Sequence, residues 1–510
     1  MPIARTLAIA ITGVTGQLVE VEADLSAGLP GLSFTGLADV SVVESRDRIR
    51  AAVLNAGAEW PNRRITVALL PADVRKVGSR FDLALALVVL AAGGAVPSGA
   101  IADVVWMAEL GLDGRLRPVR GVLPAVIAAR GAGVRRVVVA NANAAEAALV
   151  TGLAVYQAGD LREIIAWLRN EAPPPPHAST GTAAEPTGAP GPDLADVAGQ
   201  AAAKRALEVS AAGGHHLYLV GTPGAGKTML AERLPGLLPP LDDTAALEVT
   251  AVHSVAGALP PTARLLRRSP FQAPHHTASL AALVGGGSGI ATPGAISLAH
   301  HGVLFLDEAP EFHPRALDGL RQPLESGRVV LHRHAGVVTY PARFLLVLAA
   351  NPCPCGRRTR DCACPPQVRR RYQQRLSGPL LDRLDLRVYV DAVPHAELLG
   401  EPVQREASSV VACRVAAARA AATNRWGERG WRTNAEVPGS ALRARPWRLG
   451  RSALVAAERH LERGELSARG FDRVLRLAWT IADLGGNAIP DAGDVSEAVF
   501  FRTGTTSWAA

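Results

Sequence analysis

The sequence predicts an α/β protein of several domains, and three observations support this prediction. The chain has 510 residues, more than one hydrophobic core usually organises. Residues 171–192 are almost entirely proline, alanine, glycine, serine and threonine, a composition typical of an extended linker. Strand patterns then alternate with helical ones to about residue 395, and helical patterns alone follow. We therefore expect a first domain at 1–170, a parallel-sheet core at 193–400 and a helical domain at 401–510.

The first domain is expected to be α+β. The stretches RITVALLP and RRVVVAN are typical of strands, and alanine-rich helical stretches lie between them. The longest apolar run, Leu83 to Val96, is too short to span a bilayer and predicts a buried helix. The N-terminal residues lack the long apolar segment of a signal peptide. We expect a cytoplasmic protein with no membrane segment.

The charge of the chain favours an acidic partner. The formal net charge is +8, and excess positive charge suits nucleic acid. Residues 357–387 hold nine arginines against three aspartates, and residues 414–451 hold nine arginines against two glutamates. Trp426, Trp431 and Trp447 lie within the second segment, where indole rings could stack on unpaired bases. The alternative is a solvated arginine surface with tryptophans that anchor a core.

A glycine-rich stretch, GTPGAGKT, joins the strand pattern LYLVG to a helix-compatible segment. Glycines let the backbone approach phosphate closely, so that its amides and the next helix N-terminus face the negative charge. The lysine of this pattern reaches the β- and γ-phosphates of ATP, and the hydroxyl after it binds Mg²⁺. A strand-to-helix turn without a ligand is the alternative. The predicted nucleotide-binding residues are Gly221, Thr222, Pro223, Gly224, Ala225, Gly226, Lys227 and Thr228.

Two carboxylates end a second strand pattern, GVLFLDEAPEF. Asp307 and Glu308 are expected at the carboxyl edge of a buried strand, where open α/β sheets bind their ligands. Asp307 would hold Mg²⁺ through water, and Glu308 would orient and deprotonate the attacking water. The alternative is an ordinary turn at the end of a strand.

The order of these motifs, followed by RFLLVLAANP, LLDRLDL and SARGFDRVLRLA, resembles the AAA+ ATPases. Within them the chain is most similar to the magnesium-chelatase-like YifB/ComM family, with FQAPHHTASLAALVGGG and PGAISLAHHGVLFLDEAPEF as the most diagnostic segments. The resemblance implies that Asn351 positions the water, that Arg383 is an arginine finger serving a neighbouring subunit, and that Arg469 is the second sensor. Alternatively, Arg383 pairs with an adjacent aspartate and Arg469 is a solvated helix-start residue.

The same resemblance implies a ring, most plausibly a hexamer, with a helical C-terminal lid. It also implies a DNA motor, because ComM-like proteins act in branch migration during recombination. The expected function is therefore ATP-driven helicase or branch-migration activity on single-stranded or branched DNA. Two alternatives are a chelatase-type ATPase that remodels a metal-inserting partner and a protein-remodelling unfoldase.

The first domain resembles the ribosomal-S5-like fold shared with Lon-type proteases, through ADVRKVGSRFDLALAL and ELGLDGRLRPVRGVLPAVIAARGAGVRRVVV. A Lon-like peptidase needs a serine nucleophile and a lysine that activates it. Aligned without gaps, these two positions hold Arg80 and Leu123. The nearest substitutes are Ser79 and Lys76. We therefore expect a relic of the protease fold that lacks peptidase activity.

Four of the five cysteines lie in a loop at 353–364, in the stretch NPCPCGRRTRDCAC. A cytosolic compartment disfavours a disulfide, and four thiolates satisfy tetrahedral Zn²⁺. The C-x-C pairs are tighter than the C-x₂-C pairs of common zinc modules. A reduced cluster without metal and a redox switch stay open as alternatives. The predicted ligands are Cys353, Cys355, Cys362 and Cys364.

Two histidine-containing segments flank the carboxylate strand. His275 and His276 fall in an insertion before that strand, and we expect them to form hydrogen bonds rather than a metal site, because neighbouring strand residues point oppositely and no third ligand is evident. The stretch LESGRVVLHRHAGVVTYPARF predicts a hairpin that carries Arg328, His332, Arg333 and His334, and the alternative is a solvated hairpin face.

Overall fold

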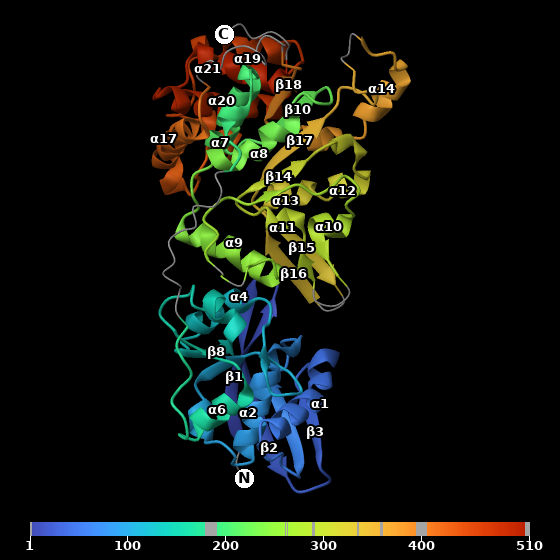
Figure 1. Ribbon diagram of the computed structural model, residues 1–510. Helices are drawn as coiled ribbons and strands as arrows, with labels where there is room; N and C mark the ends of the chain where they lie inside the picture. Colours follow the sequence, from blue (N-terminus) through green and yellow to red (C-terminus); the bar gives the residue numbers. More distant parts are fainter. Residues whose placement is uncertain are drawn as a thin grey trace.

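The computed structural model describes residues 3–178, 191–260, 262, 264–287, 291–333, 336–357, 361–393 and 405–504. Figure 1 shows an elongated molecule with an N-terminal sheet at one end, a second sheet in the middle and a helical bundle at the far end. The structure is thus mixed α/β with a parallel-sheet core, as the sequence predicts. Most of the predicted linker, the expected boundary near residue 400, and His334 lie outside the described residues.

The N-terminal sheet has seven strands in the order β3-β4-β2-β1-β5-β8-β9. Its two longest strands form an antiparallel hairpin, and apolar and polar residues alternate along the second of them, so that one face is buried. RITVALLP and RRVVVAN form β4 and β8, which confirms both predicted strands. The strands are β1 (Ala4–Thr12), β2 (Thr15–Ser26), β3 (Gly31–Thr35), β4 (Arg64–Leu70), β5 (Val104–Met107), β8 (Arg136–Ala140) and β9 (Ala154–Ala158), with a small β6–β7 pair (Glu109–Leu110, Leu116–Arg117).

Helices cover this sheet, and α2 (Asp82–Ala92) lies in its core with every residue buried. The predicted apolar helix therefore forms, but it ends before the glycine pair at 93–94, earlier than the apolar run ends. Asp82 tolerates burial because its carboxylate accepts hydrogen bonds from Ser45 and Arg48. The other helices are α1 (Val40–Asn55), α3 (Ser98–Ile101), α4 (Val122–Gly131), α5 (Ala144–Ala147) and α6 (Leu161–Leu168).

The central sheet has five parallel strands in the order β11-β14-β17-β10-β18. Its three middle strands are buried on both faces, which explains their unbroken apolar sequences. LYLVG, VLFL and LLVLAA form β10, β14 and β17, so the predicted βαβ pattern is confirmed. The strands are β10 (Leu217–Gly221), β11 (Phe271–Gln272), β14 (Val303–Leu306), β17 (Leu345–Ala350) and β18 (Leu386–Val390).

Helices and two insertions surround this sheet. One insertion, between β11 and β14, contains α10 (Leu280–Val284), β12 (Gly285–Gly286), β13 (Thr292–Pro293) and α11 (Ala295–Leu298). The other is the predicted hairpin, formed by β15 (Arg328–Arg333) and β16 (Gly336–Pro341). The remaining helices of this region are α7 (Ala201–Gly213), α8 (Lys227–Leu237), α9 (Asp243–Ala256), α12 (Pro314–Asp318), α13 (Arg321–Ser326), α14 (Pro366–Gln373) and α15 (Gly378–Leu381).

The C-terminal region is helical, as predicted, and packs on α7 and α8. Its helices are α17 (Ser408–Trp426), α18 (Gly439–Leu442), α19 (Arg451–Glu462), α20 (Ala468–Gly485) and α21 (Ala492–Thr503). Most of α20 is buried, including every residue from Leu477 to Asp483, whereas α21 is buried only in part.

Of the tryptophans in residues 414–451, Trp426 belongs to the core and cannot stack on bases, whereas Trp431 and Trp447 are half-buried against it, and for these two the suggestion stays a prediction. Trp426 is completely buried, and its indole N–H donates to Asn434. Trp431 and Trp447 pack against Trp426, with ring centroids 6.2 Å and 4.6 Å away. Five of the nine arginines also have structural partners: Arg414, Arg419, Arg425, Arg432 and Arg443.

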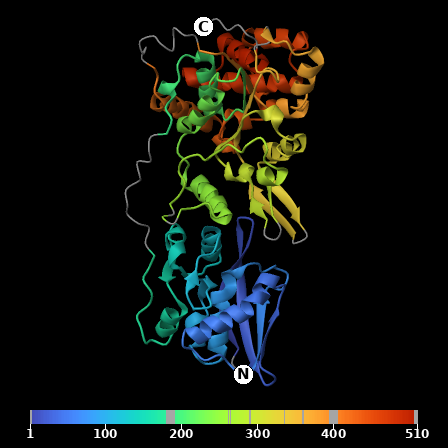
Figure 2. The same cartoon turned by 45° about the vertical axis from the view of Figure 1, so that its right-hand side comes forward.

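The N-terminal and central regions touch at two places. The backbone N–H of Gly121 donates to the carbonyl of Ser254 in α9, and the Ser254 hydroxyl donates to the buried carboxylate of Glu146. In Figure 2 the β1–β2 hairpin reaches up to the β15–β16 hairpin. Gly13 at its tip lies so close to the Thr339 carbonyl that a Cβ atom there would be 2.6 Å from the oxygen. No helix in the described part of the chain is long and apolar enough to cross a membrane.

Candidate nucleotide-binding site

The phosphate-binding loop leaves the carboxyl end of β10 and leads directly into α8. Gly224 and Gly226 have φ angles of +75° and +91°, a left-handed conformation that residues with a Cβ atom rarely adopt. Gly221 also requires its lack of a side chain, since a Cβ atom there would lie 2.3 Å from the Val390 carbonyl of β18. The predicted strand, loop and helix therefore come together with their glycines where the backbone needs them.

Lys227, the first residue of α8, turns back over this loop. Its ammonium donates to the carbonyls of Gly221 and Thr222 at 2.8 Å and 3.0 Å, and to the Asn351 side chain at 3.1 Å. Burial lowers the pKa of Lys227, while the nearby Asp307 and Glu308 raise it. A cation held by exchangeable oxygen acceptors is suited to receive phosphate oxygens in their place.

Thr228 and Asp307 meet across the site from different elements. The Thr228 hydroxyl donates to Asp307 Oδ2 at 2.6 Å, joining the start of α8 to the end of β14. A hydroxyl beside a carboxylate is the oxygen donor set that Mg²⁺ prefers together with phosphate and water. These two residues fit the Mg²⁺ that the predicted nucleotide would bring.

Glu308 stands in a strained backbone conformation, with φ of +49° in the left-handed region. Its carboxylate lies 3.2 Å from His276 Nδ1. His276 belongs to the insertion after β11. Its neighbour His275 contacts the hydroxyl of Thr277 through Nδ1. His275 thus forms hydrogen bonds within its own loop, as expected, whereas His276 lies beside the Glu308 carboxylate. The link from His276 to Glu308 was missed, because sequence alone does not pair residues 32 positions apart.

Asn351 directly follows β17, the strand next to β10 in the sheet. Its side chain reaches Lys227, and its backbone N–H donates to the hydroxyl of Tyr372 in α14. The carboxyl ends of three neighbouring strands therefore bring Lys227, Asp307, Glu308 and Asn351 to one edge of the sheet.

Arg383 and Arg469 lie elsewhere in the chain, and they share a cavity of about 320 Å³. The cavity is also lined by His216 and Asp385, which directly precede β10 and β18. It therefore lies at the amino edge of the sheet, about 16 Å from the phosphate-binding loop, given five residues of strand at ~3.3 Å each. Neither arginine faces the nucleotide loop of its own chain.

The local partners of Arg383 differ from the aspartates considered above. Its guanidinium donates to Glu325 and to the Pro379 carbonyl. Asp385 instead pairs with Arg473, and Asp382 lies 3.9 Å from Arg502. Arg469 is exposed beside the start of α20.

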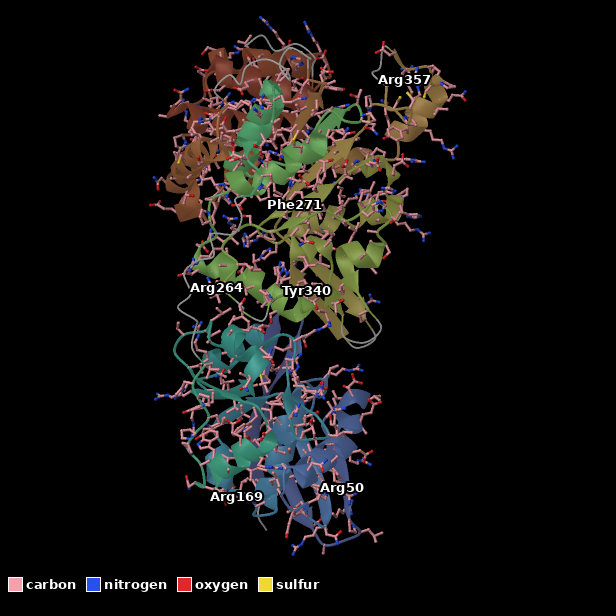
Figure 3. The ribbon with its side chains drawn as sticks, viewed as in Figure 1. Arg50, Arg169, Arg264, Phe271, Tyr340 and Arg357 are labelled. Atoms are coloured by element: carbon pink, nitrogen blue, oxygen red, sulfur yellow. The ribbon has the colours of Figure 1, made fainter. Side chains whose placement is uncertain are left out.

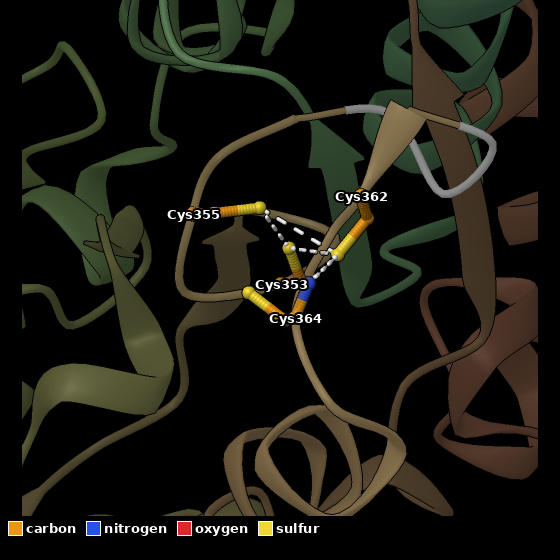
Figure 4. Close-up of side chains that lie close together, drawn as sticks. All are labelled: Cys353, Cys355, Cys362 and Cys364. Atoms are coloured by element: carbon orange, nitrogen blue, oxygen red, sulfur yellow. Dashed lines mark hydrogen bonds between the residues drawn. The ribbon is translucent and has the colours of Figure 1, made fainter.

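The four clustered cysteines lie on the same side as the nucleotide loop, between β17 and α14. Figure 4 shows their side chains converging, and each sulfur atom lies within 4.8 Å of the others. The Sγ of Cys353 is 2.8 Å from that of Cys355 and 3.2 Å from that of Cys362. Cys413 is on α17 and exposed.

At the positions where a Lon-like peptidase would hold its serine and lysine, and at the nearby Ser79 and Lys76, the polar groups form hydrogen bonds with other residues. The Ser79 hydroxyl donates to Glu109, and the buried Lys76 ammonium donates to the Pro71 carbonyl. The backbone of Leu123 donates to Glu146 at 2.8 Å. Burial lowers the pKa of Arg80 to about 10, and the charge of Glu146 opposes this. The structure therefore gives the serine and the lysine separate hydrogen bonds.

The parallel sheet, its strand order and the convergent loop define a P-loop nucleotide-binding protein of the AAA+ class. Family models agree: the magnesium chelatase subunit ChlI model matches residues 193–398, a second ChlI model matches 21–143, and the ChlI C-terminal model matches 405–502.

Comparison with individual proteins identifies the family within this class. The chain is 51% identical over 508 residues to an uncharacterized protein of Mycobacterium tuberculosis, covering 98% of this chain and 99% of the relative. It is 41% identical to the uncharacterized protein YifB of Escherichia coli (97% and 96% covered) and to the competence protein ComM of Haemophilus influenzae (98% and 98%). The chain therefore belongs to the YifB/ComM family of magnesium-chelatase-like proteins.

Membership in this family indicates ATPase activity and implies ATP and Mg²⁺ as ligands. A weaker match, 33% identity over 171 residues, links the chain to the Lon protease of Mycolicibacterium smegmatis, covering 31% of this chain and 21% of that protein.

Proposed function

We propose that the protein is an ATP-hydrolysing ring motor that acts on DNA, with helicase or branch-migration activity on recombination intermediates. The observation that carries this proposal is the separation of Arg383 and Arg469 from the nucleotide loop of their own chain. The two arginines lie at the amino edge of the central sheet and the phosphate-binding loop at its carboxyl edge. With this arrangement, the arginines of one subunit can contact the nucleotide that a neighbouring subunit binds. A closed ring, most plausibly a hexamer, satisfies this arrangement for every subunit.

The roles of the residues follow from their chemistry. The backbone amides of residues 221–228 and the Lys227 ammonium would hold the phosphates. Mg²⁺, held by Thr228 and Asp307, would neutralise charge on the β- and γ-phosphate oxygens. Glu308 would accept a proton from the attacking water, which Asn351 would help to orient.

In this proposal, Arg383 and Arg469 complete the nucleotide site of the adjacent subunit. A guanidinium that contacts the γ-phosphate stabilises the charge of the transition state and is worth 10³–10⁵ in rate in other phosphoryl-transfer enzymes. In the isolated chain, Arg383 is balanced by Glu325. Assembly would replace that carboxylate with phosphate, so that hydrolysis depends on the ring.

DNA is the proposed substrate for two reasons. A full-length relative is named a competence protein. In addition, α14 carries exposed arginines at 370 and 371 beside the cysteine loop. Arg357, labelled in Figure 3, lies on the same projecting lobe. Arginines free to contact phosphate suit a polyanionic track.

A second candidate is a chelatase-like or protein-remodelling ATPase. The family models that match the chain are named for a magnesium chelatase subunit, and the second basic segment, 414–451, spends much of its charge on internal contacts. We propose a cytoplasmic location for either activity, where ATP, Mg²⁺ and chromosomal DNA are available, and no peptidase activity.

The test is the steady-state ATPase rate with no DNA, single-stranded DNA, duplex DNA and a four-way junction, with Lys227→Ala as the blank. The motor predicts stimulation that is strongest on single-stranded or branched DNA and falls as salt rises, because phosphate contacts release counterions. A rate that no DNA changes would favour the chelatase-like or protein-remodelling activity instead.

A further inference from the structure

We propose that Cys353, Cys355, Cys362 and Cys364 bind one Zn²⁺, and that this structural metal site fixes the loop which packs against the phosphate-binding loop. The regulatory part of this inference, that zinc supports nucleotide binding, rests on the function proposed above. The metal part does not depend on it.

The first argument is the geometry of the sulfur atoms. Zinc holds thiolates at about 2.3 Å, so tetrahedral ligands lie about 3.8 Å from one another. The described separations of 2.8, 3.2 and 3.6 Å are slightly shorter, so small side-chain rotations open the cluster to this size. All four cysteines are free, and none of these distances approaches the roughly 2.05 Å of a disulfide.

Backbone groups also face the sulfur atoms. The N–H of Cys364 donates to Cys362 Sγ at 3.4 Å, and the N–H of Arg357 donates to Cys355 Sγ. Each donor lies two residues after the cysteine that accepts its bond. Such bonds offset the negative charge that four thiolates carry beyond the charge of one Zn²⁺, and supporting hydrogen bonds of this kind orient metal ligands.

The loop contains few apolar residues. Between Asn351 and Cys364 the stretch NPCPCGRRTRDCAC has one alanine and two prolines as its only apolar residues besides cysteine. Only Cys353 among the four is fully buried. A segment that buries so little apolar surface gains its order from cross-links, and binding of zinc supplies folding free energy directly.

The cysteine loop contacts the nucleotide site, so a metal bound there can affect nucleotide binding. Gly356, in the turn that Cys353 begins, lies so close to Pro223 of the phosphate-binding loop that a Cβ atom there would be 2.7 Å from Pro223 Cγ. At the base of the loop, Asn351 contacts Lys227, and its N–H meets Tyr372 of α14. The cysteine loop therefore lies between the nucleotide site and the arginines of α14, in contact with the first.

Four sulfur ligands alone do not separate zinc from iron, because both accept tetrahedral thiolates. Zinc is the proposed occupant because the loop is a short structural connection, and zinc contributes no redox chemistry that would need protection. Binding forms four Zn–S bonds and releases the protons of those thiols that were protonated.

The experiment measures the metal content of the full chain by elemental analysis, for the wild type, Cys362→Ser and the matched control Cys413→Ser. We expect about one zinc per chain in the wild type and the control, and less than about a fifth of that in Cys362→Ser. Because Cys362→Ser could fail to fold, a second measurement uses wild-type protein: a thiol reagent titrated into it should release zinc as the four clustered thiols are modified, whereas modification of the exposed Cys413 should release none. Folded wild-type protein with neither zinc nor release, or with iron in its place, would overturn the assignment.

The link to the nucleotide is measured separately, as binding of a fluorescent ADP analogue to wild-type protein before and after chelation of the metal. We expect affinity to fall about tenfold, a typical coupling between neighbouring sites, and to recover when zinc is restored. Unchanged affinity would overturn the regulatory part alone. If the protein binds zinc but does not hydrolyse ATP, the proposed motor is wrong and the metal site is supported. If the protein is free of metal but has DNA-stimulated ATPase activity, the metal site is wrong and the proposed motor is supported.

Discussion

The central and N-terminal regions both contain residues typical of catalysis, yet only the central region assembles them. At the carboxyl edge of the central sheet, Lys227 contacts Asn351, and Thr228 contacts Asp307, across separate strands. In the N-terminal region, Ser79 and Lys76 have separate partners, and Arg80 and Leu123 occupy the positions that a peptidase needs. The difference teaches that convergence of side chains from different elements distinguishes a site from a set of suitable residues.

The largest effect is expected from Lys227→Ala. This change removes the cation that faces the phosphates, so nucleotide binding and ATPase activity should both be lost. Lys76→Ala is the matched control, because it removes a lysine whose ammonium contacts only a backbone carbonyl among the described residues. Nucleotide binding by fluorescence titration checks both variants. If both variants fold and lose nucleotide binding equally, the proposed difference between the central and N-terminal regions is wrong.

Arg383→Ala should lower the ATPase rate by about 10³-fold without weakening ATP binding. Its partner in the isolated chain, Glu325, is exposed, so stability should change little. Mixing Arg383→Ala with Lys227→Ala should restore part of the activity, because some interfaces then pair an intact loop with an intact arginine. Full activity of Arg383→Ala alone would rule out its role in the neighbouring site.

His276→Ala should lower kcat for ATP hydrolysis by about tenfold and leave the KM for ATP unchanged. The imidazole holds the Glu308 carboxylate, and a misplaced general base loses rate rather than substrate affinity. His275→Ala is the control, since that ring contacts Thr277. The kcat and KM of both variants check this prediction, and a raised KM in His276→Ala would point to a role in binding instead.

The smallest effect is expected at the contact between the two regions. Burial raises the pKa of Glu146, although hydrogen bonds from Ser254 and Leu123 lower it. A carboxyl group with a raised pKa in the folded state contributes most stability below its ordinary pKa of 4.5, and this contribution is lost as pH rises through the raised value.

Glu146→Gln should therefore raise the Tm by about 2 °C at pH 8, relative to the wild type, and the difference should shrink toward pH 5. Scanning calorimetry at both values checks it, with Glu163→Gln, a change in α6 away from this contact, as the control. A Tm difference that does not vary with pH would show that the titration of Glu146 does not govern this contact.

Much of this architecture could be predicted from the sequence because local patterns determine it. Short apolar stretches between helical patterns predicted the strands β4, β8, β10, β14 and β17, and helical patterns predicted α17 and α20. Glycine, lysine and threonine at fixed spacing predicted the nucleotide loop, because its backbone conformation requires the glycines and its ligands require the two polar side chains.

Contacts between distant segments could not be predicted in this way. Nothing in the sequence pairs His276 with Glu308, Arg383 with Glu325 or Gly356 with Pro223, since each pair depends on how complete elements pack. Trp426 shows the same limit: an aromatic residue among arginines suits either a core or a nucleic-acid surface, and its complete burial places it in the core.

The tip of the β1–β2 hairpin has a mechanical consequence. Gly13 abuts the Thr339 carbonyl without space for a side chain, and Ile11, Val14 and Val338 all pack against one hydrophobic cluster. Close-packed backbone cannot absorb a displacement by rotating side chains, because the atoms already touch. If the β15–β16 hairpin shifts during the ATP cycle, this contact converts the shift into tilting of the whole N-terminal sheet. In the ring motor proposed above, that sheet would act as a lever arm, because it extends from this contact to the far end of the molecule.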